Sequence, residues 1–372
     1  MDGRSYSRAV KILCFHPALA PYRVDFFNLL CELAELKMVF LQENLQTQKF
    51  DQNALLAKLK VPYEYLTSGV CIRGRCVRTG ILRIVRRERP DIILAYEASP
   101  VTVELITLKK IGFIKSKIWT SMDDSPEQVR SRRGLRRIMR DWVLRNVENV
   151  IVPSQAAADA YRSLPINDYR QTTNNYSVVP IIHDTATMRK NVDKVYASGR
   201  AWREQNCPRA WKRVFVFVGR FAEVKNLPWL IERMRDQPDT TGLVLVGDGV
   251  LAAELKAKVT ALKFEGRVMF AGRKEGDELY SIMAMADALL LCSHSETFGA
   301  VVAEALQWGT PCIVASHLGA SVMIEDGKNG AVFTYNDAKS FKDAIGRLPV
   351  RSNKSLLKSD LRLSVERLIK EI

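Results

Sequence analysis

Two carboxylates flank the start of a predicted helix near residue 300. Glu296 lies on a loop after the apolar run 288–292, and Glu304 lies in the first turns of a helix expected to open at about Gly299. The apolar run indicates a buried strand. A helix that opens directly after a strand directs unpaired N–H groups above the sheet edge, where they suit a phosphate. The carboxylates can accept hydrogen bonds from sugar or ribose hydroxyls, but their spacing also fits a helix-terminal charge and a solvated helix position.

Two cations follow a second apolar run. The strand expected at 213–218 leads into Gly219 and a loop that carries Arg220 and Lys225. Cations on such a loop suit a diphosphate leaving group, because the negative charge that develops on it must be neutralised. Taken alone, a loop arginine and a loop lysine are more often solvated surface residues.

The full string around these residues resembles a known donor-site signature. It is similar to that of family-four retaining glycosyltransferases of the GT-B fold, the glycosyl transferases group 1, of bacterial surface-glycan type. The matching residues are Glu296-x7-Glu304 with Phe298-Gly299 inside, Gly309-Thr-Pro311, Gly319, the stretch 324–330, Gly219-Arg220 with Lys225-Asn226, and Gly247-Asp-Gly249. The resemblance is strong over 213–333 and looser before it. It implies an α/β fold of two doubly wound Rossmann-like domains that face a cleft.

The resemblance also implies roles for individual residues. Glu296, Arg220 and Lys225 are expected to be catalytic. The residues expected to hold the donor nucleotide sugar are Gly219, Arg220, Lys225, Arg273, Lys274, Phe298, Gly299, Ala300 and Glu304. Glu296 would orient the sugar and Glu304 the ribose. Neither a bound cofactor nor a metal is expected, since the protein's cations neutralise the diphosphate and the four histidines are dispersed.

The acceptor is expected at the first domain. Its candidate residues are Arg23, Glu97, Asp123 and Asp124. Glu97 follows a predicted strand, at the sheet edge where ligands bind in open α/β folds. Arg23 also fits a surface arginine, and the aspartates also fit helix caps. The chain departs from the family pattern in three places: it lacks a Gly-Gly pair near Arg23, has Met122 where relatives have histidine, and has Ile181-Ile182 in place of Asn-Gly.

The length of 372 residues allows two domains with sizeable cores. We expect an acceptor-binding domain at 1–185, a charged linker at 186–211, a donor-binding domain at 212–354, and a helix at 355–372 that returns to the first domain. No apolar run is long enough to span a membrane, and no signal peptide is expected at the start. The seven scattered cysteines fit a reducing, cytoplasmic setting, with Cys71-x4-Cys76 as a weak redox or metal pair.

Most of the basic surplus lies in the first half. The net charge is +15, and the first 205 residues account for 12 of these charges. A predicted helix at 130–147 combines an apolar stripe with arginines at 132, 133, 136, 137, 140 and 145. It fits an anionic membrane surface, a nucleic-acid backbone, or a stripe packed on the sheet with its arginines in water. Few aromatic residues accompany the arginines, so nucleic acid is not expected as a partner.

The sequence therefore predicts a glycosyltransferase that retains anomeric configuration and needs no metal. It would move a sugar from a UDP- or GDP-linked donor to a hydroxyl of a saccharide or lipid-linked saccharide, in cell-surface polysaccharide biosynthesis. The expected location is the cytoplasm, at the inner face of the membrane. Two alternatives remain: a nucleic-acid-binding protein on a GT-B scaffold, and a GT-B epimerase or phosphorylase.

Overall fold

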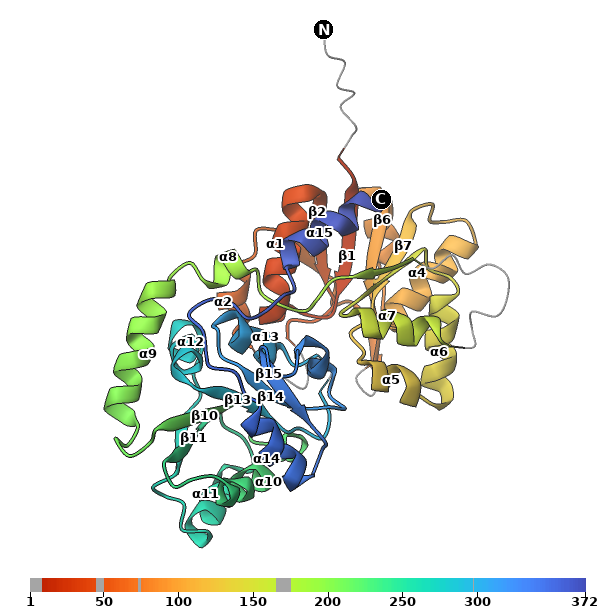
Figure 1. Cartoon of the computed structure of the whole chain (residues 1–372). Helices are drawn as coiled ribbons and strands as arrows, with labels where there is room; N and C mark the ends of the chain where they lie inside the picture. The colour runs from red at the N-terminus through yellow and green to blue at the C-terminus, as the bar shows by residue number, and fades with distance from the viewer. Residues whose placement is uncertain (1–8, 45–49, 73–74, 165–174, 297) are drawn as a thin grey trace. The chain divides into compact units, whose positions relative to one another are not determined.

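The chain divides into two compact units (Figure 1). The first comprises Met1–Asp184 with Leu361–Ile372, and the second comprises Thr185–Asp360. The computed structural model describes residues 9–44, 50–72, 75–164, 175–296 and 298–372. The side chains of Cys71 and Cys76, considered above as a pair, lie outside the described part. None of the described helices combines the length and the apolar character that crossing a membrane requires.

A seven-stranded parallel sheet forms the centre of the first unit. Its strand order is β3-β2-β1-β6-β7-β8-β9, so the chain winds outward from β1 on one side and from β6 on the other. The strands are β1 (Lys11–His16), β2 (Glu35–Phe40), β3 (Tyr63–Tyr65), β6 (Ile92–Tyr96), β7 (Lys117–Ser121), β8 (Asn149–Val152) and β9 (Asn175–Val178). A separate antiparallel hairpin joins β4 (Gly69–Ile72) to β5 (Arg75–Arg78).

Helices connect these parallel strands, and α15, which comes after the second unit in the chain, adds one more helix to the first. They are α1 (Pro21–Leu33), α2 (Gln52–Leu56), α3 (Ile81–Glu88), α4 (Pro100–Lys110), α5 (Pro126–Ser131), α6 (Gly134–Leu144), α7 (Gln155–Arg162) and α15 (Leu361–Lys370). Three of them begin at a serine whose hydroxyl accepts a backbone N–H of the first turn: Ser99, Ser125 and Ser154. Such caps satisfy amide groups that a helix start leaves unpaired. They therefore place sharp helix starts just beyond β6, β7 and β8.

The second unit repeats this plan with six parallel strands. Its strand order is β12-β11-β10-β13-β14-β15. The strands are β10 (Arg213–Val218), β11 (Thr241–Val246), β12 (Val268–Gly272), β13 (Ala288–Leu291), β14 (Cys312–Ala315) and β15 (Gly330–Phe333). The interior strands are buried along continuous apolar runs rather than at alternate positions, as in sheets covered on both faces.

In the second unit α8 and α9 precede the first strand, and the other helices follow strands. The helices are α8 (Thr185–Met188), α9 (Val192–Asn206), α10 (Leu227–Arg233), α11 (Ala252–Ala261), α12 (Gly276–Met285), α13 (Ala300–Gln307) and α14 (Ala338–Gly346), with the short 3-10 turns η2 (Glu223–Lys225), η3 (Met234–Asp236) and η4 (Gly319–Met323). Both units are thus doubly wound, Rossmann-like α/β bodies, as the sequence predicts.

The segment expected as a linker contains a long helix. Helix α9 has 15 residues and packs against α12 in the second unit. The two helices approach closely at Gly199, where a Cβ would lie 2.6 Å from the carbonyl oxygen of Ser281. The charged composition of 186–211 therefore reflects a helix with one buried side and one solvated side.

The prediction of one helix over 130–147 is wrong. Two helices, α5 and α6, occupy this region, and the break falls at Arg132-Arg133 before Gly134, which has a φ of 62°. The arginines do not all face solvent either. Arg140 is 1% exposed and donates a hydrogen bond of 2.8 Å to the carbonyl of Val129 on α5. The apolar residues Leu135 and Ile138, in contrast, are 72% and 65% exposed.

Helix α15 belongs to the first unit, where it lies beside α1 (Figure 1). Its apolar side chains Leu361, Val365 and Leu368 are buried. An ion pair of 3.0 Å joins Arg362 to Glu32 of α1. The first unit is therefore assembled from both ends of the chain.

Candidate active site

The second sheet changes winding direction between β10 and β13. The chain runs from β10 outward through β11 and β12, then returns to the other side of β10 and continues through β14 and β15. The loops that leave β10 and β13 therefore diverge, and open α/β sheets bind ligands at such a point. These two loops carry the residues predicted to be catalytic.

Lys225 and Glu296 form an ion pair at this point. Lys225 Nζ donates a hydrogen bond to Glu296 Oε2. Their side chains are 14% and 21% exposed, so the pair is partly shielded but reachable. Lys225 lies in η2 after β10, and Glu296 lies between β13 and α13. Two of the three predicted catalytic residues thus meet although 71 positions separate them.

Backbone hydrogen bonds hold the two loops together. The N–H of His294 donates to the carbonyl of Val224 over 2.8 Å, and the N–H of Gly319 donates to the carbonyl of Glu296 over 3.3 Å. The buried thiol of Cys292 lies 3.5 Å from the carbonyl oxygen of Lys225. The positions of Lys225 and Glu296 are therefore set by the backbone and not only by their own charges.

Helix α13 begins beside Glu296. Gly299 precedes it with a φ of 72°, a conformation that favours glycine, and a Cβ there would lie 2.6 Å from the Cβ of Ala320. Phe298 is buried and anchors the turn, and Ala300 is the first helical residue. Among the described residues no side chain caps this helix start, so its first amides are available for an anion.

Gly219 and Arg220 lie on the loop after β10. Gly219 has a φ of 153°, and a Cβ there would lie 3.7 Å from Cε of Lys225, so the lysine stem runs close over it. Arg220 is exposed on the same loop. The loop rests on the turn after β11: the N–H of Phe221 donates to the carbonyl of Asp248 over 2.8 Å.

Arg273 and Lys274 make local ion pairs. They follow β12, the edge strand of the sheet, and pair with Glu275 and Glu278 respectively. The structure gives them no contact with the Lys225–Glu296 pair. Glu304 lies on α13 and is half-buried. The donor-side candidates are therefore spread over three loops, with Lys225 and Glu296 as the pair in direct contact.

A second polar cluster lies at the winding change of the first sheet, between β1 and β6. Arg23 is 4% exposed and forms an ion pair with Asp123. Tyr96 donates its hydroxyl to the same carboxylate over 3.2 Å. The interpretation of Arg23 as a surface residue is therefore wrong: α1 carries its guanidinium inward. His16 closes the cluster, with its ring 4.8 Å from that of Tyr96.

Burial controls the charge of His16. Burial, and then the positive charge of Arg23, lower the pKa of His16 to about 4. The imidazole is therefore neutral at pH 7. With Nδ1–H donating to the carbonyl of Ala18 over 3.0 Å, Nε2 carries a lone pair, and this buried atom has no hydrogen-bond partner among the described residues.

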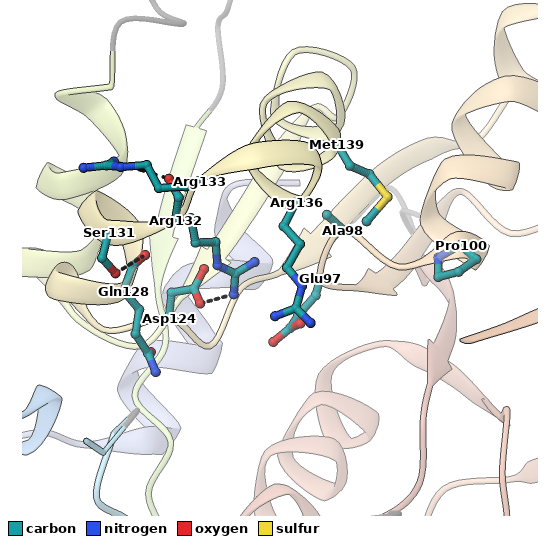
Figure 2. Close-up of a pocket in the computed structure, with 10 residues that line it drawn as sticks. All are labelled: Glu97, Ala98, Pro100, Asp124, Gln128, Ser131, Arg132, Arg133, Arg136 and Met139. Carbon is teal, nitrogen blue, oxygen red and sulfur yellow. Dashed lines mark hydrogen bonds and ion pairs between the residues drawn. The ribbon is translucent and has the colours of Figure 1, made fainter. Parts of the chain in front are cut away.

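Glu97 and Asp124 line a neighbouring pocket (Figure 2). Asp124 is 4% exposed, forms an ion pair with Arg132, and accepts a hydrogen bond of 2.5 Å from the hydroxyl of Tyr161. Neither Asp123 nor Asp124 caps a helix, because Ser125 and Gln128 form the capping box of α5. Burial, and then the charges of Asp123 and Asp124, raise the pKa of Glu97 to about 7.

Comparison with known proteins finds a family similarity within the second unit. Residues 199–354 match the family model described as Glycosyl transferases group 1. The glycosyl transferases group 1 region thus contains every donor-side residue named above, from Gly219 to Glu304.

Curated relatives of the glycosyl transferases group 1 region match over part of their length. D-inositol 3-phosphate glycosyltransferase of Corynebacterium aurimucosum is 29% identical over 237 residues, which are 61% of this chain and 53% of that protein. The chain spans about half the length of these curated relatives, which include N-acetyl-alpha-D-glucosaminyl L-malate synthase of Bacillus anthracis. These matches show similarity to glycosyltransferases and transfer no substrate to this chain.

Solved structures of similar fold cover nearly the whole chain. HepE of Anabaena, in complex with UDP, has a TM-score of 0.73 and 18% identity over 97% of this chain and 99% of its own. The lipopolysaccharide outer core galactosyltransferase WaaB has a TM-score of 0.70 and 17% identity, with the same coverage. At this level of identity the likeness shows the fold, which is the GT-B architecture of two Rossmann-like domains.

The sequence did not indicate that some further residues lie on the loops near the Lys225–Glu296 pair. Tyr335 contacts His294 through its hydroxyl, and His317 Nε2 lies 2.9 Å from the carbonyl oxygen of His294. The rings of His317 and Tyr335 lie 4.8 Å apart. The three residues follow different strands, and only the order of strands in the sheet brings them together.

Proposed function

We propose that this protein is a retaining glycosyltransferase. It moves a sugar from a nucleoside diphosphate sugar to a hydroxyl of a saccharide or lipid-linked saccharide. The observation that carries the proposal is the Lys225–Glu296 pair, which lies at the winding change of a glycosyl transferases group 1 region and beside the start of α13. Because HepE has been solved with UDP and with UDP-glucose, a uridine donor is the first to test.

The donor site neutralises the departing diphosphate. Lys225, Arg220 and the first amides of α13 supply positive charge where the phosphate oxygens become more negative as the glycosidic bond breaks. These groups supply the charge that a metal ion provides in other transferases, so the reaction proceeds without one. Glu296 then lies beside the bound diphosphate and accepts hydrogen bonds from the sugar hydroxyls, while Glu304 binds the ribose.

Retention follows without an enzymic nucleophile. The bond between the anomeric carbon and the diphosphate breaks, and the acceptor oxygen bonds to the same face of the sugar. The proton of the acceptor hydroxyl passes to an oxygen of the leaving diphosphate. Glu296 serves in this scheme as an orienting group, because its ion pair with Lys225 fixes the direction of the carboxylate on the loop.

Nucleotide binding tests the donor site. We expect UDP, titrated calorimetrically in the presence of EDTA, to bind the purified protein more tightly than ADP. Lys225→Ala removes the partly shielded cation and should weaken UDP binding by about tenfold or more, since a charge-assisted hydrogen bond contributes about 1.5–3 kcal/mol. Lys342→Ala, at an exposed lysine on α14, is the matched control and should bind UDP like the wild type.

The outcomes separate the competing functions. If neither UDP nor GDP binds without metal, the donor site as described is wrong. Retention on DNA with no nucleotide binding would favour a nucleic-acid-binding protein. Nucleotide sugar that is epimerised, or glycan that is cleaved by phosphate, would replace transfer by one of the other GT-B reactions.

Product stereochemistry tests retention. With an α-linked UDP-sugar and an acceptor identified by screening, the anomeric proton of the new glycoside should show the small coupling of an α-linkage. A β-linked product would reject the retaining mechanism while leaving the transfer itself in place. Glu296→Gln should lower kcat with little change in UDP affinity, because it alters contacts to the sugar and not to the diphosphate.

We also propose that the protein works at the inner face of the membrane, in cell-surface polysaccharide biosynthesis. The support is α6, which exposes Leu135 and Ile138 beside Arg136 and Arg137, the pattern of a helix that lies on an anionic bilayer. The fold shared with WaaB, a lipopolysaccharide galactosyltransferase, is consistent with such a role.

Vesicle flotation tests this location. The protein should float with phosphatidylcholine vesicles that contain 30% phosphatidylglycerol, and the Leu135→Ser/Ile138→Ser variant should remain in the soluble fraction. The control is Val350→Ser, which removes an apolar side chain that is 90% exposed in the second unit. Equal flotation of all three proteins would show that α6 is not the contact, and no flotation of the wild type would reject membrane association.

A further inference from the structure

A pocket of about 590 Å³ lies within the first unit, at the carboxyl edge of its sheet (Figure 2). One wall is the end of β6 and the start of α4, with Glu97 and Pro100. The opposite wall comes from α5, α6 and the turn between them. The charged and amide side chains that line it are Glu97, Asp124, Gln128, Arg132, Arg133 and Arg136.

The arginines of the pocket differ in their partners. Arg132 is already paired with Asp124. Arg136 makes no hydrogen bond and no ion pair with any described residue, although it lines the pocket. Figure 2 shows the side chains of Arg132 and Arg136 extending toward the side where Glu97 lies, whereas the guanidinium of Arg133 is turned away. Two guanidinium groups thus serve one pocket, and Asp124 neutralises only one of them.

Glu97 does not neutralise the guanidinium of Arg136. It is held in the left-handed region with a φ of 50°, and its N–H donates to the carbonyl of Ser121 over 2.8 Å. Burial and the nearby aspartates raise the pKa of its carboxyl to about 7, so a large fraction is protonated at neutral pH. A protonated carboxyl can donate a hydrogen bond to an anionic oxygen. The pocket therefore combines an unneutralised cation with a further donor.

We propose that this pocket binds a phosphate monoester carried by the acceptor substrate, with Arg132 and Arg136 on its oxygens. Guanidinium groups present paired N–H donors that match phosphate oxygens, and a dianionic monoester matches the positive surplus better than a single carboxylate does. The inference rests on the proposed glycosyltransferase function, because it assigns the bound phosphate to the molecule that receives the sugar. The phosphate comes either from a soluble sugar or polyol phosphate or from a lipid headgroup.

Calorimetry with glycerol 3-phosphate tests the soluble form. The wild type should bind it, and Arg136→Gln should weaken binding at least tenfold. Arg83→Gln changes an exposed arginine of α3 that also lacks an ion pair with described residues, and it should bind like the wild type. Uncharged glycerol should not bind. Equal affinity of the wild type and Arg136→Gln would overturn the proposal.

Vesicles test the lipid form. Phosphatidylcholine vesicles with 20% phosphatidic acid present the same monoester, whereas phosphatidylglycerol presents a diester. Binding that prefers phosphatidic acid and falls in Arg136→Gln, but not in Arg137→Gln on the same helix, supports a lipid headgroup as the source. Equal binding to both lipids, with equal losses in the two variants, shows general surface charge only. That result, together with no binding of glycerol 3-phosphate, rejects the proposal that the pocket binds a phosphate monoester.

UDP titration of the same samples distinguishes failure of the phosphate-binding proposal from failure of the glycosyltransferase proposal. Arg136→Gln should leave UDP affinity unchanged, because the residue lies in the first unit and the donor residues lie in the second. Loss of the monoester with UDP binding intact therefore concerns the pocket alone. A wild type that binds glycerol 3-phosphate but no nucleotide would reject the transferase and keep the anion site.

Discussion

Glu97 carries a pH dependence of stability. Its folded pKa of about 7 exceeds the usual value of 4.5, so the folded protein retains a proton that the unfolded chain releases. Stability from this group is full below pH 4.5 and is lost as the pH rises through 7. Glu97→Gln should therefore be more stable than the wild type at pH 8, on the order of 2 kcal/mol, and similar at pH 4.5. Urea unfolding at both values checks this, with Glu265→Gln, at an exposed loop glutamate, as the control.

The buried pair Arg23–Asp123 should be sensitive to loss of one partner. Arg23→Met leaves the Asp123 carboxylate with Tyr96 alone among the interactions described above, and the first unit should lose about 3–5 kcal/mol of stability. The double variant Arg23→Met/Asp123→Leu should recover part of this loss, because it removes both charges. Urea unfolding measures both. A double variant as unstable as the single one would show that the two side chains stabilise the first unit by their packing and not by balancing their charges.

The contact between Lys225 and Glu296 could be anticipated from the sequence, whereas that between Arg23 and Asp123 could not. Lys225 and Glu296 each follow an apolar run, and parallel strands bring such loops to one sheet edge. Arg23 lies within a helix 100 positions before its partner, and no spacing rule joins the two. The raised pKa of Glu97 likewise depends on Asp123 and Asp124, which approach only through strand order.

Among the loops, the turn after β11 positions the donor loop. Gly247 has a φ of 139°, and a Cβ there would clash with the carbonyl oxygen of Gly219. Gly247→Ala should therefore displace the segment 219–221, destabilise the second unit by more than about 1 kcal/mol, and weaken UDP binding. Gly266→Ala, where a Cβ would meet nothing within 4 Å, is the control. Calorimetry and thermal unfolding measure both effects. Unchanged UDP affinity in Gly247→Ala would separate this turn from the donor site.

Strands were easier to predict than helix boundaries. The apolar runs at 213–218 and 288–292 both contain strands, since buried parallel strands are continuous in apolar residues. The prediction of one helix over 130–147 was wrong because the run of arginines gave no sign of a break. The break falls before Gly134, where the backbone enters the left-handed region. Helix α9 was not predicted, because it lies in a charged segment that was expected to be a linker and only one of its sides is apolar.

For the whole molecule, the joining of distant chain segments matters most. Deleting residues 361–372 removes α15 and uncovers the part of the first unit that Leu361, Val365 and Leu368 cover. We expect the first unit to unfold at a lower temperature while the second unit, which is continuous in sequence, keeps its UDP binding. Calorimetric scanning with and without UDP checks this. A single transition that shifts as a whole, and that UDP still raises, would show that the two units unfold together.

The place of α15 also sets an order on biosynthesis. The ribosome synthesises the whole second unit between α1 and α15, so α1 lacks its helical neighbour until residues 361–370 have been made. During that interval the second unit can already close around its own core. The first unit exposes an apolar surface until α15 emerges, and this is the period in which chaperones would bind it. Folding of the newly made protein is therefore completed from its amino-terminal half last, although that half is made first.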